Sequence, residues 1–261
     1  MQIIYVVVAA ILGVIGISIV VSLGAALVAI VVAVLLAAFA VFIIVYVGLF
    51  LYDNGPAMWK FVRTTAVKAN KMYLWVLLKL HSQKKGKTIG NPEVAARHWK
   101  FQRGNTCAIN AQRIVLAIHG VFRSESQLVA RQSSYGRHTA NGSSDISMLL
   151  EGYGLKSRMV NFASRRDLPL RLFSTFRKGR VAIVPVNSSL INQPDPAFDS
   201  PIGARVDHVV IATAMEPLGN GHYKVYYTDT GVADGRLKAV DERVLVGAGE
   251  NRFVEGPKIP A

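Results

Sequence analysis

The sequence has a single cysteine, Cys107, and its first 52 residues contain no charged residue and no histidine. One cysteine excludes an internal disulfide framework and leaves a free thiol, which is typical of a reducing compartment. The net charge of +14 therefore belongs entirely to residues 53–261. A Walker-type P-loop motif is also missing, so these residues carry no P-loop ATPase and are not a complete peptidase-transporter.

An uncharged apolar run extends from Ile3 to Tyr52. It is about twice as long as the roughly 20 residues that a helix needs to cross a bilayer core. We therefore expect two transmembrane helices, at about 3–21 and 25–51, joined near Ser22 and Gly24. Two rival interpretations are one long tilted helix and a pair of helices that inserts only under particular conditions. A secretory signal peptide fits poorly, because the run has no basic n-region and is too long.

The segment after this run is strongly basic. Between Lys60 and Arg103 there are eleven Lys or Arg residues and one acid, Glu93. Basic flanks are retained in the cytoplasm, which predicts a membrane hairpin with both ends and the following domain on the cytoplasmic side. Residues 56–81 mix aromatic and basic side chains and predict either an interfacial helix or an amphipathic helix packed on the next domain.

The composition divides the chain into three predicted parts. Residues 1–52 form the transmembrane hairpin, 53–95 form a basic amphipathic connector with a linker at 82–93, and 96–261 form the main folded domain.

The stretch from Cys107 to Ile118 is mostly apolar, contains no Pro or Gly, and stops before Gly120. This pattern predicts a largely buried helix. Asn105 or Thr106 would cap the helix, so that Cys107 lies in its first turn, where unpaired amides and the helix dipole favour a thiolate. The alternative interpretation is a small buried apolar residue, which is the usual role of a lone cysteine.

Two other residues favour a nucleophilic role for Cys107. Gln102 precedes it by five positions, and His208 follows about a hundred residues later in a predicted strand. A cysteine at the head of a buried helix, with a glutamine before it and a distant histidine, is the papain-type arrangement. It predicts Cys107 as the nucleophile, His208 as the general base and Gln102 as an oxyanion donor.

The segments 206–214 and 222–229 are rich in β-forming residues and flank the turn sequence EPLGNG, which predicts a hairpin. A hairpin centred near position 218.5 would place Asp229 directly opposite His208, or within about one residue of it. Opposed residues have Cβ atoms about 4.5–5.5 Å apart, close enough for the carboxylate to orient the imidazole. Asp207 would point to the other face of the strand and is a poor orienter.

These motifs together resemble the C39-like peptidases, the papain-fold family that includes the leader peptidases of bacteriocin exporters. The similarity covers residues 96–240: the cysteine helix with its Ile118-His119-Gly120 turn, the SESQLVARQ helix with the capping-box pattern of Ser124 and Gln127, the segment 141–160, the strand 180–187, and the His208–Asp229 hairpin. The chain departs from the family in three places: the spacing from Gln102 to Cys107 is one residue shorter, and Ala108 and Thr230 replace a usual Gly and Pro.

The resemblance implies an α+β, papain-like cysteine peptidase fold, with an N-terminal helical part and an antiparallel sheet that carries the His and Asp. Together with the apolar run, it implies an enzyme anchored in the bacterial inner membrane, with its catalytic domain in the cytoplasm. The enzyme would cleave peptide bonds through Cys107, His208 and Asp229, at small-residue or double-glycine sites. Its partners would be a protein or peptide substrate and the lipid bilayer. We expect no cofactor, no metal and no specific nucleic acid.

Three alternatives remain open at this point. The same catalytic groups could serve an antibacterial effector that acts on a cytoplasmic protein and is paired with a cognate inhibitor or immunity protein. They could also catalyse deamidation or transglutamination, since the same thioester intermediate can be intercepted in different ways. A third alternative is a non-enzymatic membrane or nucleic-acid binder driven by the charge of +14.

Overall fold

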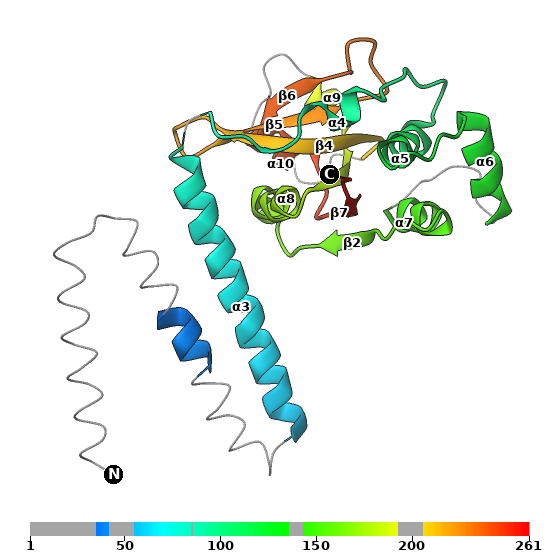
Figure 1. The fold of residues 1–261 in the computed structure, drawn as a ribbon. Coiled ribbons are helices and arrows are strands. Elements are labelled where there is room, and N and C mark those ends of the chain that lie inside the picture. The colour runs from blue at the N-terminus through cyan, green and yellow to red at the C-terminus, as the bar shows by residue number, and fades with distance from the viewer. Residues whose placement is uncertain (1–34, 42–54, 85, 136–142, 193–205, 261) are drawn as a thin grey trace, which may run out of the picture. The chain divides into compact units, whose positions relative to one another are not determined.

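The computed structural model describes residues 35–41, 55–84, 86–135, 143–192 and 206–260. Two compact units divide the chain, Met1–Lys71 and Met72–Ala261, and the four predicted catalytic residues all belong to the second. The helices with assigned bounds (Figure 1) are α3 (Gly55–Ser82), α4 (Glu93–Ala96), α5 (Cys107–Ile118), α6 (Glu125–Ser134), α7 (Ser143–Gly152), η1 (Arg165–Asp167), α8 (Leu168–Arg177), α9 (Ser188–Ile191) and α10 (Glu242–Ala248). The strands are β1 (Ile89–Gly90), β2 (Arg158–Asn161), β3 (Arg180–Val186), β4 (His208–Pro217), β5 (Tyr223–Thr228), β6 (Lys238–Asp241) and β7 (Arg252–Lys258).

The second unit is an α+β domain built on one antiparallel sheet. Its strands run in the order β2-β7-β3-β4-β5-β6, and β1 pairs with the far end of β4. Because neighbouring strands are antiparallel, the start of β4 lies at the same end of the sheet as the end of β3 and the start of β7. Val186 shows this directly, since it pairs with His208 on one side and bridges to Gly249 on the other.

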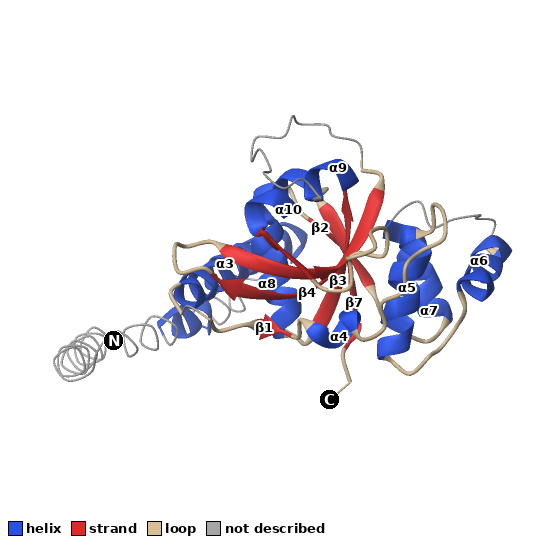
Figure 2. Cartoon of the chain, turned by 90° about the horizontal axis from the view of Figure 1, so that it is seen from above, coloured by secondary structure: helices blue, strands red, loops and turns tan. Residues whose placement is uncertain are grey.

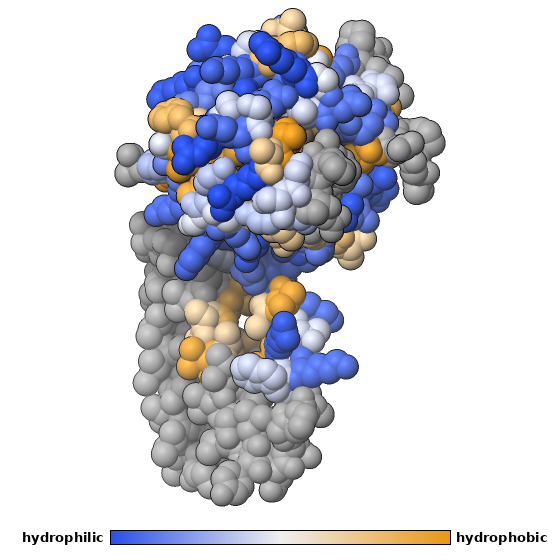
Figure 3. Space-filling model, turned by 90° about the vertical axis from the view of Figure 1, so that its right-hand side faces the viewer, coloured by the Kyte–Doolittle hydropathy of each residue, from blue (hydrophilic) through white to orange (hydrophobic). Residues whose placement is uncertain are grey.

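Helices cover both faces of the sheet (Figure 2). Alternate residues of β3 enter two separate apolar clusters: Val181 and Ile183 pack with α5 and α7, whereas Val184 packs with α8 and α10. This alternation follows from the two-residue period of a strand, and burial of both faces explains why β3 is a continuous apolar run. Hydrophilic side chains predominate on the face of the second unit shown in Figure 3.

A buried carboxylate, Glu255, joins β7 to its neighbours. Its side chain is 4 % exposed, and its oxygens lie 3.2 Å from Arg158 and 3.5 Å from Arg180. The hydroxyl of Thr175 donates a hydrogen bond of 3.1 Å to the same carboxylate, and Lys178 lies 3.9 Å away. Buried charges are tolerated only when they are paired and hydrogen-bonded, so Glu255 links β2, β3 and α8 at this position.

Gly55–Ser82 of the predicted connector form the helix α3, and its last turns, from Met72 onward, belong to the second unit. Leu74 is buried, and Leu77 and Leu78 contact the cluster on the α8 face of the sheet. For this part of the segment, the structure supports the packed amphipathic helix rather than the interfacial helix.

The predicted membrane anchor requires a correction. In the part of the chain that the structure describes, no helix combines the length and the apolar character that a membrane span needs. The helix α3 is long enough but carries lysine or arginine along most of its length. The predicted transmembrane hairpin and inner-membrane localisation are therefore not upheld. Of the two predicted spans, 3–21 lies wholly outside the described residues, and of 25–51 only residues 35–41 are described.

Candidate active site

Cys107 is the first residue of α5 and is partly exposed to solvent. The helix forms here because an apolar run packs on β4, with Ile109, Ile114 and Leu116 fully buried. It ends where Gly120 adopts a φ of 76°, a left-handed conformation that glycine adopts without strain. Cys107 therefore stands at the open end of a well-anchored helix, where the first backbone N–H groups have no partner within the helix.

Thr106 occupies the N-cap position of α5, one of the two predicted for it, but its hydroxyl accepts no capping hydrogen bond from the helix backbone. The hydroxyl instead donates to Glu125 Oε1 at 2.6 Å and accepts from Asn110 Nδ2 at 3.0 Å. These contacts tie the turn before Cys107 to α6 and to the next turn of α5. The N-cap residue before the thiol is thus held by side-chain hydrogen bonds rather than by a capping bond.

His208 and Asp229 lie against one another at the same end of the sheet. His208 is the first residue of β4, and Asp229 directly follows β5. The distance from His208 Nε2 to Asp229 Oδ1 is 2.6 Å, and the side chains are 8 % and 0 % exposed. The backbone N–H of Gly231 donates a second hydrogen bond of 2.7 Å to the same carboxylate oxygen. Because Nε2 is occupied by Asp229, Nδ1 is the ring nitrogen left for another partner.

The hairpin register differs from the predicted one. Ile211 pairs with Thr228, so continuing the register puts Asp229 opposite Val210, two residues from His208. A shift of two residues keeps the side chains on the same face of the strands, which is why His208 and Asp229 still meet. The register also shifts by one residue between Ala212 and Ala214, and without that bulge Asp229 would lie on the opposite face.

The electrostatics couple these two residues to the thiol. Burial by itself would lower the pKa of His208, but the hydrogen bond to Asp229 and the contact with the Cys107 side chain outweigh it and raise the pKa to about 9. Burial would also raise the pKa of Asp229, but the His208 ring and the Gly231 amide hold it below its ordinary value. The structure therefore brings His208 and Asp229 together, and the Cys107 side chain is near enough to contribute to the raised pKa of His208.

Gln102 is hydrogen-bonded to Thr230, the residue that follows Asp229. Its backbone N–H donates to the carbonyl of Thr230 at 2.9 Å, and its Oε1 accepts a hydrogen bond of 2.9 Å from the Thr230 hydroxyl. Its Nε2 donates to the carbonyl of Gly104 at 3.0 Å. A side-chain amide nitrogen carries two protons, so this contact leaves one for another acceptor. Thr230 thereby determines which way the Gln102 amide is turned.

Two residues that the sequence analysis did not identify also shape the site. The indole N–H of Trp99 donates to the backbone carbonyl of Asp229 at 2.7 Å, a contact between residues 130 positions apart. Gly231 packs so closely on the imidazole that an added Cβ would lie 2.7 Å from His208 Cε1. Neither residue belongs to a local pattern, so no signal in the sequence distinguishes them.

A group suited to a metal ion occurs elsewhere, at the turn end of the hairpin. His222, Asp241 and Glu242 each offer one ligand atom within 4.8 Å of the others. Both carboxylates already have partners, however: Asp241 binds the Arg243 guanidinium and caps α10, and Glu242 accepts from His222 and from the backbone of Tyr223. Internal hydrogen bonds account for the group, and it lies outside the Cys107 site.

Comparison with known proteins yields similarity to solved structures only. No family model matches the sequence, and no curated protein matches it. A double glycine motif protease from an AMS/PCAT transporter, in complex with the leader peptide, is 12% identical with a TM-score of 0.39, covering 61% of this chain and 90% of that one. UfSP from C. elegans is 13% identical with a TM-score of 0.41, covering 59% of this chain and 30% of that one. At these TM-scores neither similarity carries an assignment of activity.

Proposed function

We propose that the chain is a cysteine peptidase in which Cys107 is the nucleophile, His208 the general base and Asp229 the residue that orients the base. One observation supports this most strongly. Asp229 lies 2.6 Å from Nε2 of His208, and an interaction with the Cys107 side chain helps to raise the pKa of the imidazole. A nucleophile, a base and an orienting third group within contact of one another are what covalent acyl transfer requires.

The proposed reaction has two stages. The thiol proton passes to His208 before the attack and is held there as an imidazolium. The sulfur of Cys107 then attacks the carbonyl carbon of a peptide bond to give a tetrahedral intermediate. Collapse of that intermediate breaks the C–N bond, and the imidazolium gives its proton to the leaving amine. A water molecule, deprotonated by the same imidazole, then hydrolyses the thioester and restores the thiol. Asp229 holds the ring in one orientation throughout.

The oxyanion of the tetrahedral intermediate would be stabilised by two donors. These are the backbone N–H of Cys107, at the open start of α5, and the second Nε2 proton of Gln102. Each donor of this kind contributes on the order of 3 kcal/mol to transition-state stabilisation. The hydrogen bond from Thr230 supports the role of Gln102, because it commits Oε1 as an acceptor and so turns Nε2 the other way.

The proposed mechanism requires an accessible peptide carbonyl, so the substrate would be a protein or a peptide. The sequence resemblance further implies small residues, including paired glycines, at the cleavage site. Peptides of that type are therefore the first defined substrates to test.

The test is a comparison of new protein N-termini in a lysate treated with the wild-type chain or with the Cys107→Ala variant. We expect new N-termini only with the wild-type chain. If both proteins generate the same N-termini, or neither generates any, the peptidase proposal is wrong. One-dalton changes or cross-links without new N-termini would assign the site to deamidation or transglutamination instead.

A further inference from the structure

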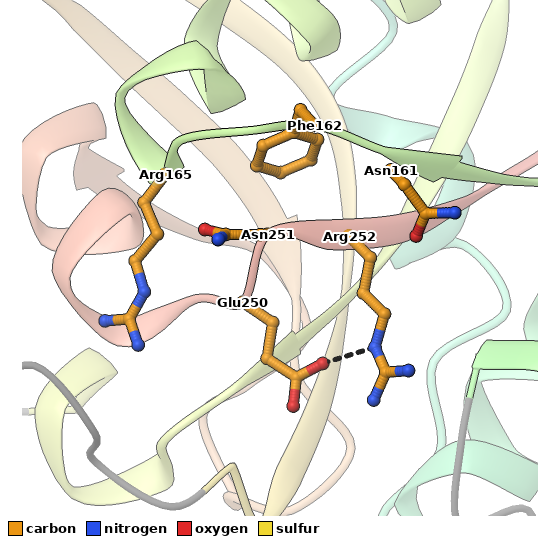
Figure 4. Close-up of a pocket in the computed structure, with 6 residues that line it drawn as sticks. All are labelled: Asn161, Phe162, Arg165, Glu250, Asn251 and Arg252. Atoms are coloured by element: carbon orange, nitrogen blue, oxygen red, sulfur yellow. Dashed lines mark hydrogen bonds and ion pairs between the residues drawn. The ribbon is translucent and has the colours of Figure 1, made fainter.

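A shallow pocket of about 380 Å³ opens at one end of the sheet (Figure 4). Its lining comes from the end of β2, the start of η1 and the segment that leads into β7, namely Asn161, Phe162, Arg165, Glu250, Asn251 and Arg252. Phe162 is 8 % exposed and belongs to the core cluster, so it gives the pocket one firm apolar wall. The other five residues are polar or charged, which makes the pocket suited to a polar group carried on a short apolar stem.

The pocket lies at the same end of the sheet as the proposed catalytic residues. Val186 pairs with His208 on one side and bridges to Gly249, the residue before Glu250, on the other. Neighbouring strands are about 4.8 Å apart, so two spacings separate β4 from the start of β7 and three separate it from β2. The pocket is therefore roughly 10–15 Å from His208, which an extended peptide covers in about three to five residues.

The charge of the pocket is positive. Glu250 accepts a hydrogen bond of 2.6 Å from Arg252 Nε, which pairs one of the two guanidinium groups. Arg165 donates to the carbonyl of Gly247 at 3.2 Å and has no carboxylate partner among the described residues. Figure 4 shows Arg165 and Arg252 on either side of Glu250 and Asn251. A guanidinium carries five N–H donors, so Arg165 retains most of its capacity to bind a carboxylate.

We propose that this pocket is a substrate subsite that binds a carboxylate of the peptide, three to five residues from the cleaved bond, with Arg165 as its main contact. The inference rests on the proposed peptidase function and adds a specificity to it. Arg165 would be a specificity-determining residue, not a catalytic one. The carboxylate could belong to an Asp or Glu side chain or to the C-terminus of a short peptide, since both present the same group to a guanidinium.

The first measurement uses a peptide library digested by the wild-type chain and analysed by mass spectrometry. We expect Asp and Glu to be enriched at positions three to five residues from the cleaved bond, on one side of it. Enrichment at a fixed distance from the peptide C-terminus, with no residue preference, would instead assign the pocket to the terminal carboxylate. Cleavage without either pattern would overturn the subsite, and absence of cleavage that depends on Cys107 would overturn the peptidase function itself.

The second measurement compares two peptides that differ only by Glu or Gln at the enriched position, or by a free or amidated C-terminus if that pattern is found. For Arg165→Ala we expect kcat/KM to fall at least five-fold for the peptide with the carboxylate and to stay within two-fold for its neutral counterpart. Arg166→Ala is the matched control, because Arg166 lies in the same short helix, is exposed and does not line the pocket. Equal losses on both peptides, or the same loss in Arg166→Ala, would overturn the assignment.

Discussion

Gly231→Ala is the sharpest test of the geometry around the imidazole. The added Cβ would lie 2.7 Å from Cε1 and 3.1 Å from Nε2 of His208, and 3.2 Å from Asp229 Oδ1. Carbon atoms in contact are normally about 3.5–4.0 Å apart, so the ring must move by about 1 Å. The φ of Gly231 is not in the left-handed region, and alanine can adopt its backbone conformation. The effect is therefore steric and acts directly on the ring.

A displacement of about 1 Å at a reacting group lowers the rate roughly 100-fold. We expect kcat/KM for a cleaved peptide to fall by about that factor in Gly231→Ala, while thermal unfolding stays cooperative. Ala233→Ser is the control, because it also adds one heavy atom to the same loop but at an exposed position. If a folded Gly231→Ala protein has wild-type activity, the observed position of the His208 ring is not needed for cleavage.

Three further predictions concern pH, a buried charge and a positioning residue. Because the pKa of His208 is raised to about 9, its charged form contributes about 3 kcal/mol of stability, which is fully present below pH 6.5 and lost as the pH rises through 9. Denaturant unfolding from pH 6 to pH 10 should show this loss of stability. In His208→Asn the pH dependence from this residue should be absent. Glu255→Gln should lower the free energy of unfolding by roughly 1.5–3 kcal/mol, measured by denaturant unfolding, because the Thr175 hydroxyl and three basic side chains lose their charged acceptor, with activity per folded molecule unchanged. Thr230→Val should lower kcat about 10-fold at constant KM, whereas Thr230→Ser should keep the wild-type kcat. If Thr230→Val lowers kcat by the same factor when Gln102 is already replaced by Ala, Thr230 does not act by positioning Gln102.

Local signals in the sequence were sufficient for several elements. The helix Cys107–Ile118 was predicted with its observed bounds, because an apolar run without Pro or Gly ends before Gly120. The capping box of Ser124 and Gln127 forms both of its hydrogen bonds. These features depend only on residues within one or two turns of each other, which explains why a single sequence reveals them.

Features that depend on distant residues were not predictable. Nothing in the strand VDHVVIATA marks the extra residue between Ala212 and Ala214, although this bulge decides which face Asp229 occupies. The contacts of Trp99 and Gly231 with the His208–Asp229 pair exist only after the chain has folded. Hydropathy alone also predicted membrane spans that no helix in the described residues supports.

The most direct test of the central claim is the rate at which iodoacetamide alkylates Cys107, which needs no substrate and has one thiol to follow. His208→Ala is compared with His119→Ala, a matched loss of histidine at the other end of α5. If His208 accepts the thiol proton, alkylation at pH 7 is at least 10-fold slower in His208→Ala than in the wild-type chain, and unchanged in His119→Ala. Equal rates in all three proteins would contradict a catalytic pairing of Cys107 with His208.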